Sequence, residues 1–466
     1  MNCGACTPMT PVTFPNRSVK PRLNSPSIAL ARTEISIWNS RICIRKIFPE
    51  CQEKFIKIIG LQEAYDPQMR TPPITPAALE PLLPRAPQAG GLLEKAHDLR
   101  TEAARLSGAC QNGLNAVLAK LLPPMNAYYS NQIEGEHASP LEIARALTGD
   151  FSPDEDKARR QQLAVAHMEA ERWLQASSLA TADLYSAPVV WSIGPHIFRP
   201  LGRDGGPLSE AGALRTCDVA VGRHIAPGWQ SLDAMLQCWA EVYGGVRRGE
   251  LQIVAVAAAH HRLVWMHPFA DGNGRVARLH TWAVLRSLDL APGLWSPLRG
   301  LARSGGRYGQ RLGDADQLRL DELDGPGPLS ERMLVAWIDF FLDVCLEELR
   351  FMQRMLHRQE MLDRLKALLA HEEQVGGQRG LRMEALRPLH YLFATQAAIP
   401  RGAFGAMTGL GERTATTLIG KLLEAGLLQS DSPRGLVRFG VPMDALRFLL
   451  PNLWPEAEAA WVEPHR

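Results

Sequence analysis

Long apolar runs are absent from this sequence. Its 466 residues are 46% hydrophobic, but no stretch approaches the ~18 consecutive apolar residues that a membrane-spanning helix needs. The chain also has no basic segment followed by an apolar segment of about 7–15 residues, which is the pattern of a secretory signal. The sequence therefore predicts no membrane span and a cytoplasmic location.

An excess of charge of one sign is also absent. The 51 basic and 49 acidic side chains leave a formal net charge of +2, which excludes a histone-like polycation and an acidic solvating tail but allows local patches. Cys3 and Cys6 form one C-x-x-C pair, but no second pair follows at zinc-finger spacing. Scattered cysteines in a chain of this length favour a reduced, cytosolic protein over a disulfide framework.

The first 70 residues differ in composition from the rest. They are rich in isoleucine and basic residues, whereas the chain after Met69 is rich in Ala, Leu, Arg and Gly. Two interpretations stay open: a basic targeting or interaction arm, or a segment outside the folded unit, upstream of an initiator at Met69. The composition favours the second.

Helical periodicity dominates the middle of the chain. Apolar residues recur at three- and four-residue steps in segments 76–127, 141–147, 156–174, 231–243, 252–266, 275–287 and 330–371. Pro123 and Pro124 are expected to end the first of these helical segments. An alternating run at 216–221 predicts a half-buried strand or hairpin arm. The sequence therefore predicts a mainly α protein.

The tail has a different order of elements. Helices are expected at 383–394, 401–410 and 413–425, and two short strands at 427–430 and 436–440. Gly426 stands in the position of a helix C-cap. This order of helix, helix-turn-helix and β-hairpin is that of a winged helix, and the glycine-rich stretch 375–380 is the expected linker before it.

Residues 267–278, HPFADGNGRVAR, combine several features of a phosphate site. A helix delivers His267, and the following proline disfavours its continuation. The Gly-Asn-Gly sequence at 272–274 lets backbone N–H groups approach a ligand closely, and a new helix begins there with its positive dipole end directed into the turn. Arg275 and Arg278 lie one turn apart on that helix. Together these groups would suit a Mg-nucleotide.

The chemistry of the side chains suggests roles. Asp271 is a hard oxygen ligand for Mg²⁺ between phosphates, and Arg275 would neutralise charge as phosphates separate. His267, neutral at pH 7, could accept the proton of an attacking hydroxyl. Taken singly, each feature has a plainer explanation, because Gly-Asn-Gly is usually a loop turn and a lone histidine is usually packed or capping. No H-E-x-x-H spacing supports zinc.

The whole segment resembles the signature of the Fic (fido) family, H-x-F-x-(D/E)-G-N-G-R-x-x-R, and fills every fixed position. The resemblance implies an all-helical core with a β-hairpin flap, which moves AMP from ATP with Mg²⁺ to a hydroxyl of a target protein. The resemblance implies that His267 is the base, that Asp271 is the metal ligand and that Phe269 anchors the motif in the core. It also implies an anion hole formed by Gly272, Asn273 and Gly274. Arg275 would bind the β-phosphate and Arg278 the γ-phosphate. Position 274 is glycine, whereas Doc-type kinases have lysine there. In this position the chain resembles the AMP transferases of the family.

A second segment, residues 130–135 with sequence SNQIEG, resembles the family's inhibitory pattern (S/T)-x-x-x-E-(G/N). Its position before the catalytic motif is that of class II, with Ser130, Glu134 and Gly135 as the matching residues. The resemblance implies that Glu134 pairs with Arg278 and blocks productive placement of the γ-phosphate. In isolation such a segment would be a helix-end glutamate on a solvated face.

Two further stretches extend the resemblance. Residues 213–222 look like the family's flap, whose edge pairs with an extended segment of the target; the docking candidates are Thr216, Cys217, Asp218 and Val219. Without a target this would be an ordinary surface hairpin. Tyr308 lies near the position where relatives contact adenine, but Gly309 stands where the family often has a second tyrosine. The choice of nucleotide therefore stays open.

The third tail helix offers a different class of function. It presents candidate DNA contacts on one side, namely Arg413, Thr414, Thr417 and Lys421. A recognition helix in the major groove would use such residues. Neighbouring glutamates dilute the positive charge, and many winged helices contact proteins instead.

The predicted organisation is an irregular leader at 1–70, a helical N-terminal arm with the inhibitory helix at 71–150, a Fic core at 151–372 and a winged helix-turn-helix domain at 381–455. The predicted function is a protein adenylyltransferase that modifies itself and a Ser, Thr or Tyr hydroxyl of an unknown target, and analogy suggests a homodimer. Two alternatives stay open: removal of AMP at the same site, and a DNA-binding or adaptor protein with a catalytically idle core.

Overall fold

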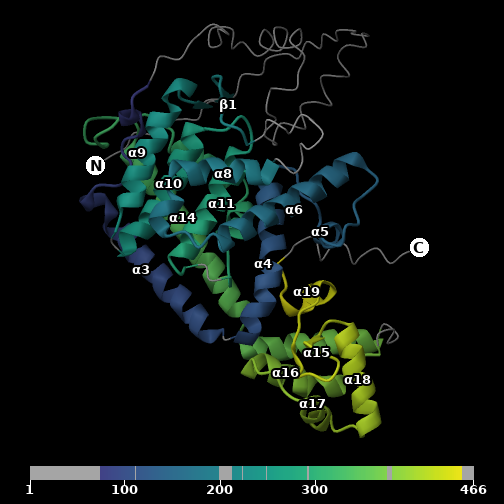
Figure 1. Cartoon of the computed structure of the whole chain (residues 1–466). Coiled ribbons are helices and arrows are strands. Elements are labelled where there is room, and N and C mark those ends of the chain that lie inside the picture. The colour runs from purple at the N-terminus through teal and green to yellow at the C-terminus, as the bar shows by residue number, and fades with distance from the viewer. Residues whose placement is uncertain are drawn as a thin grey trace, which may run out of the picture. The chain divides into compact units, whose positions relative to one another are not determined.

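A computed structural model shows a mainly helical chain (Figure 1), which confirms the predicted fold class. The structure describes residues 74–110, 112–198, 212–222, 224–247, 249–290, 293–374 and 380–453. The predicted leader at 1–70 and most of the predicted linker at 375–380 lie outside the described residues. No described helix has the length and apolarity needed to cross a bilayer.

In the described residues, the main body consists of helices and one small hairpin. Its N-terminal elements are the 3₁₀ helix η3 (Pro76–Leu79), α3 (Ala86–Ala109), α4 (Asn112–Ile133), α5 (Pro140–Ala146), α6 (Glu155–Ala176), α7 (Thr181–Leu184) and α8 (Ala187–Phe198). They are followed by β1 (Ala220–Val221), β2 (His224–Ile225), η5 (Trp229–Ser231), α9 (Leu232–Gly245), α10 (Gly249–Met266), α11 (Asn273–Ser287), α12 (Pro297–Arg303), α13 (Gly306–Asp314), α14 (Glu331–Met355) and α15 (Arg358–Gln374).

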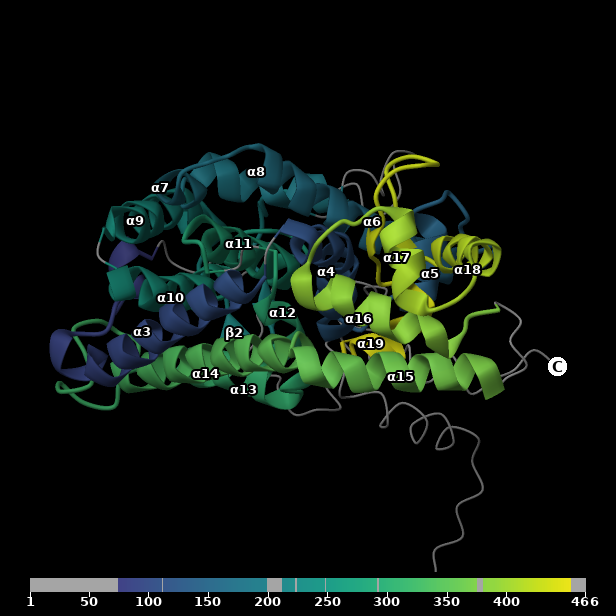
Figure 2. The ribbon, with the colours of Figure 1, turned by 90° about the horizontal axis from the view of Figure 1, so that it is seen from below.

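Helix α10 forms the centre of this body. Residues 253–263 are all buried, as expected for a helix that is covered on every side. It packs against α3, α9, α11 and α14, and Figure 2 shows it between these helices. Two indole N–H groups donate to its carbonyls: Trp239 to Ala259 at 3.1 Å and Trp337 to Ala257 at 2.7 Å. These contacts fix the middle of α10, whose C-terminal end leads into the motif.

The predicted helix end at Pro123 and Pro124 is wrong, because α4 continues through both prolines to Ile133. Each proline removes the hydrogen bond to the carbonyl four residues earlier, here Ala119 and Lys120. Both of these residues are exposed, so water can solvate their carbonyls. Burial of α4 against α6 and α12 outweighs the local preference.

The apolar stretch at 330–371 also differs from the prediction of one long helix. The structure divides it into α14 and α15, with a break at Leu356. Periodicity did not mark the break because both helices bury an apolar face. The Arg364 guanidinium donates to the carbonyl of Met355 at 2.7 Å, and so satisfies one of the carbonyls left at the end of α14.

The strand predicted at 216–221 is shorter than expected. Only β1 pairs, antiparallel to β2. Thr216 and Cys217 form an exposed bend, and neither Asp218 nor the half-buried Val219 belongs to a strand. Two side chains account for the bend: Arg215 donates to the carbonyl of Cys217 at 3.0 Å, and Asp218 accepts the backbone N–H of Trp229 at 3.1 Å. Side-chain hydrogen bonds thus take the place of the backbone hydrogen bonds between strands that the prediction implied.

The tail has the predicted order of elements. They are η6 (Met383–Ala385), α16 (Leu386–Thr395), α17 (Arg401–Thr408), α18 (Glu412–Glu424), β3 (Leu428–Gln429), β4 (Arg438–Phe439), η7 (Met443–Ala445) and α19 (Leu446–Leu449). Strands β3 and β4 are antiparallel, with Leu428 opposite Phe439. Gly426 follows α18 with a φ of 73°, a left-handed conformation that suits glycine at a helix end. The assignment to the winged-helix class stays a prediction.

Candidate active site

The turn between α10 and α11 brings the residues of the motif together. His267 has a φ of 49°, which is uncommon for a residue with a side chain and is often found at functional sites. Phe269 is buried to 1% exposure. The Asn273 side chain accepts the N–H of Phe269 and donates to its carbonyl, both at 2.9 Å. This double hydrogen bond closes the turn.

Helix α11 begins at this turn, with Gly272 as its N-cap at a φ of 83°. Asp271 is exposed, and its carboxylate accepts the N–H of Gly272 at 2.7 Å. The first N–H groups of an α-helix have no intrahelical acceptor. Those of residues 273–275 thus form, with the helix dipole, an anion-binding end.

The imidazole of His267 is neutral at pH 7. Burial, with smaller contributions from the nearby His224 and Arg215, lowers its pKa to about 4, against the opposing effects of a backbone hydrogen bond and of Glu134. A half-buried neutral imidazole can accept a proton from a hydroxyl.

Arg278 lies one turn along α11 and is completely buried. It donates to the Glu134 carboxylate at 2.7 Å, to the Ser130 carbonyl at 2.9 Å and to the Ser130 hydroxyl at 3.1 Å. Burial alone would lower the pKa of this guanidinium, but Glu134 and Tyr308 raise it above its usual value. The structure thus contains the ion pair that the resemblance implies.

A second ion pair at this site was missed by the sequence analysis. Arg275 donates to the carboxylate of Glu136 at 2.6 Å, and Arg159 of α6 donates to the other oxygen of the same carboxylate at 2.7 Å. The available signal was a second glutamate two residues after Glu134, which the inhibitory pattern does not contain.

Gly274 lies next to the ion pair between Glu134 and Arg278. A Cβ atom at this position would be 2.5 Å from Oε1 of Glu134 and 2.8 Å from Nη1 of Arg278. Glycine therefore lets the carboxylate and the guanidinium approach the backbone of α11.

The flap is attached to this turn through Arg215, another residue that the sequence analysis missed. The backbone N–H of Arg215 donates to the carbonyl of Pro268 at 3.0 Å. Its buried guanidinium donates to the carbonyls of His267 at 2.8 Å and Cys217 at 3.0 Å, and also to that of Pro227. Thr216, Cys217 and Asp218 are exposed and Val219 is half-buried.

Tyr308 is buried to 2% exposure, and its hydroxyl lies 2.9 Å from Nε2 of His260. Contact with a base stays a prediction for this residue. The neighbouring Asp316 lies 3.2 Å from Nε2 of His261 and 3.6 Å from Nδ1 of His224. His224 belongs to the flap strand β2, so this carboxylate links the flap to the end of α13.

No cluster of three or more metal-ligating side chains occurs in the part of the chain that the structure describes. Mg²⁺ usually keeps several waters and binds through one or two carboxylates and substrate phosphates. The exposed Asp271 can supply one such carboxylate.

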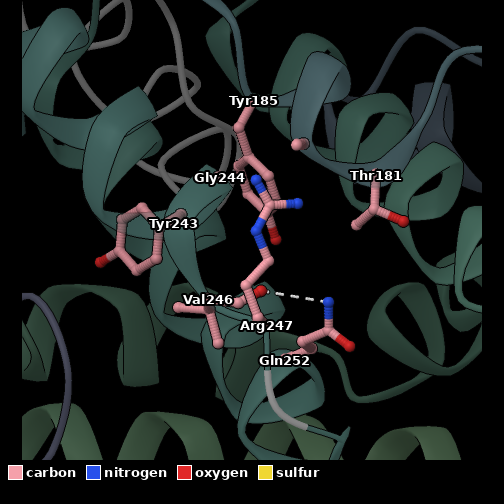
Figure 3. A pocket seen from close by; sticks show the side chains of 8 residues that line it. Thr181, Tyr185, Tyr243, Gly244, Val246, Arg247 and Gln252 are labelled. Atoms are coloured by element: carbon pink, nitrogen blue, oxygen red, sulfur yellow. Dashed lines mark hydrogen bonds between the residues drawn. The ribbon is translucent and has the colours of Figure 1, made fainter.

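A cavity elsewhere in the body is too small for a nucleotide. It has a volume of about 20 Å³, enough for a single water molecule, and Figure 3 shows a hydrogen bond beside it from Gln252 to the carbonyl of Val246. Its lining residues lie in or directly after α7 and α9 and at the start of α10: Thr181, Ala182, Tyr185, Tyr243, Gly244, Val246, Arg247 and Gln252.

In the tail, three of the four candidate DNA contacts on α18 are exposed, namely Arg413, Thr414 and Thr417, while Lys421 is half-buried. The hydroxyl of Thr417 donates to the carbonyl of Arg413 at 3.0 Å.

Comparisons with known proteins agree with the motif. Residues 190–285 match the Fic/DOC family model. The chain is 27% identical over 260 residues to the protein adenylyltransferase fic-1 of Caenorhabditis briggsae, which covers 55% of this chain and 47% of that one. It is 41% identical over 71 residues to the protein adenylyltransferase Fic of Drosophila grimshawi, covering 15% of each chain. Residues 190–285, which contain the whole 267–278 motif, are thus similar to the Fic/DOC family.

The alignments cover only part of these relatives: the chain spans less than half the length of either protein. Among solved structures, a Fic family protein from Desulfovibrio desulfuricans G20 is 15% identical and has a TM-score of 0.43, over 75% of this chain and 96% of that one.

Proposed function

We propose that this protein is a nucleotidyltransferase that moves AMP from Mg-ATP to a hydroxyl of a target protein. The observation that carries the proposal is the complete motif around one helix N-terminus, with a neutral imidazole and two arginines beside it. The names of the relatives, protein adenylyltransferases, support the same reaction.

Each group has one task in the proposed reaction. The hydroxyl oxygen of the target attacks the α-phosphorus, its proton passes to the imidazole of His267, and the bond from the α-phosphorus to the bridging oxygen breaks. Pyrophosphate leaves with the electron pair. Arg275 and the N–H groups at the start of α11 stabilise the charge that develops on the phosphates, and Asp271 holds the Mg²⁺ of the substrate.

We also propose that Glu134 inhibits this reaction. Arg278 is the proposed ligand of the γ-phosphate, and its guanidinium already binds Glu134 and Ser130. A γ-phosphate would have to replace the carboxylate. The flap, attached to the catalytic turn by Arg215, is the proposed docking edge for the target, with Thr216 to Val219 beside it, and Tyr308 is a proposed neighbour of the base.

The experiment that tests the function compares wild type, Glu134→Gly and His267→Ala in incubations with α-labelled and γ-labelled ATP. Label from the α position only, lost in His267→Ala, is the expected result. His357→Ala is the control, because His357 is exposed on the main body. Label from the γ position would indicate a kinase. No label in any variant would indicate an idle core.

The tail supports a second candidate function, sequence-specific DNA binding by α18. The supporting observation is the exposed row of Arg413, Thr414 and Thr417. A mobility-shift assay should show an affinity that falls steeply with salt, and Arg413→Gln should weaken it. Binding that is unchanged by salt, or no binding, would contradict this role.

A further inference from the structure

The chain after α4 leaves the helix in a turn with fixed geometry. The N–H of Glu136 donates to the carbonyl of Asn131 at 3.0 Å, and that of Gly135 donates to the carbonyl of Gln132 at 3.0 Å. With the φ of 74° at Gly135, these two hydrogen bonds form the Schellman motif of a helix C-terminus. The motif fixes the directions of the two residues on either side of the glycine, Glu134 and Glu136.

Both of these carboxylates bind arginines of α11. Glu134 binds Arg278, and Glu136 binds Arg275 at 2.6 Å. The two arginines are the proposed phosphate ligands, and they lie one turn apart on the same face of the helix. One turn of the chain thus places a carboxylate on each proposed phosphate ligand.

The local environment does not favour two carboxylates at this position. A helix C-terminus carries partial negative charge, which repels anions. Burial also raises the pKa of Glu136, but the charges of Arg275 and Arg159 hold it below its usual value. The arginines therefore hold the carboxylates in place, and an anion with more charge can compete for the same arginines.

Glu136 also leaves part of Arg275 unsatisfied. The Nε atom of Arg275 is buried and has no hydrogen-bond partner among the described residues, although Nη2 is bound to the carboxylate. A phosphate has more acceptor oxygens than the one that Glu136 offers to Arg275, and a charged oxygen bound in place of the carboxylate could also reach the Nε–H.

We propose that Glu136 is a second residue that controls nucleotide binding: with Glu134 it forms a pair of carboxylates that occupy the β- and γ-phosphate positions together. The inference rests on the proposed function, because it takes Arg275 and Arg278 as phosphate ligands. Since both glutamates belong to one turn, movement of that turn removes both competitors at once. Arg159 gives Glu136 a second cation, which stabilises the closed position of the turn.

The test measures binding rather than transfer. Calorimetric titration of Mg-ATP into the full chain is compared for wild type, Glu134→Gly, Glu136→Gln and the double variant. Glutamine keeps the size of Glu136 but removes its charge, so Glu136→Gln should bind Mg-ATP about 5-fold more tightly than wild type, and the double variant more tightly than either single one. The control is Glu169→Gln, which removes an exposed carboxylate of α6 and should leave the affinity unchanged.

The outcomes separate this inference from the proposed function. If Glu134→Gly binds Mg-ATP more tightly than wild type but Glu136→Gln does not, the role of Glu136 is overturned and the proposed function stands. Weaker binding by Glu136→Gln would show that Glu136 orients Arg275 for the phosphate. That result also overturns the proposed competition between Glu136 and the nucleotide. If Mg-ATP binds without any transfer of AMP, the proposed reaction fails while the binding series still decides the inference. If no variant binds Mg-ATP, both fail. Urea unfolding of each variant checks that it folds.

Discussion

Glu134 and Arg278 are joined by a 2.7 Å ion pair in which the guanidinium is completely buried. The carboxylate comes from the turn after α4 and the guanidinium from α11, so the pair connects two segments 144 residues apart in the chain. Because Gly274 has no Cβ, both groups lie close to the backbone of α11. In the proposed function, this carboxylate occupies the position that the γ-phosphate would need.

The first prediction concerns this ion pair. Glu134→Gly removes the carboxylate but leaves Arg278 bonded to Ser130. We expect the rate of self-modification with α-labelled ATP to rise about tenfold or more. A tenfold rise corresponds to about 1.4 kcal/mol of free energy by which Glu134 opposes productive nucleotide binding. Glu169→Gln serves as the matched control and should behave as wild type. An unchanged rate in Glu134→Gly would contradict autoinhibition by this residue.

The second prediction uses two glycines with nearly the same positive φ. Gly272 and Gly293 have φ values of 83° and 82°, but a Cβ at 272 would lie 2.2 Å from the ring of Phe198, whereas a Cβ at 293 would meet nothing within 4 Å. Gly293→Ala should therefore reduce the free energy of unfolding only by the cost of the left-handed conformation, about 1 kcal/mol. Gly272→Ala should cost about 2 kcal/mol more, because the buried ring cannot yield easily.

Urea unfolding of the two alanine variants measures this difference directly. Equal losses of stability would mean that the ring of Phe198 moves away freely, and that the turn tolerates a side chain at its N-cap.

Much of the main body was predictable because its helices follow apolar periodicity. The start of α11 was predicted correctly, since Gly-Asn-Gly and the following arginines mark it in the sequence. The end of α4 was not, because the burial that carries the helix through Pro123 and Pro124 depends on α6 and α12, which are distant in sequence. Local propensity cannot include such contacts.

The candidate site was also predictable only in part. The segment 267–278 can be recognised from sequence alone because its residues are contiguous. The partners of its arginines and carbonyls come from distant segments: Glu136 precedes Arg275 by 139 residues, and Arg215 precedes His267 by 52. A glutamate two residues after an inhibitory motif and an arginine within a flap have no pattern that would predict those contacts.

The third prediction concerns acid sensitivity. His167 is completely buried, and burial together with the nearby Arg278 and Arg275 lowers its pKa to about 3. Neither ring nitrogen has a hydrogen-bond partner among the described residues. Below about pH 6.5 the unfolded chain binds a proton at this histidine that the folded chain does not bind until about pH 3, so stability falls as the pH falls through that range.

Replacing the ring removes this proton linkage. In wild type, His167 should lower the free energy of unfolding by about 1 kcal/mol between pH 7.5 and pH 5.5, and His167→Leu should lose that part of the slope. The exposed His357→Leu is the control and should keep the wild-type slope. Chemical unfolding at a series of pH values checks both, and identical slopes for wild type and His167→Leu would contradict the buried, neutral state of the ring.

The last prediction concerns Arg215. Its buried guanidinium donates to the carbonyls of Cys217 and Pro227, on either side of the β1–β2 hairpin, and to that of His267 in the turn before α11. Arg215→Met keeps a long side chain with a similar apolar stem but removes the guanidinium and with it all of these hydrogen-bond donors. Buried carbonyls that lose a charged donor cost about 1–3 kcal/mol each, so we expect a loss of about 2 kcal/mol or more in the free energy of unfolding. Because the flap ends lose their attachment first, the effect should be uneven along the chain.

Hydrogen exchange resolves that unevenness. Amides at 213–227 and 266–270 should exchange at least about tenfold faster in Arg215→Met than in wild type, while those in the interior of α14 change less, since local opening requires less free energy than global unfolding. Arg247→Met, at an exposed arginine away from the motif, provides the matched control. If exchange in Arg215→Met rises equally in α14 and in the flap, Arg215 supports the fold as a whole, and its role as the specific link between the flap and the turn before α11 is contradicted.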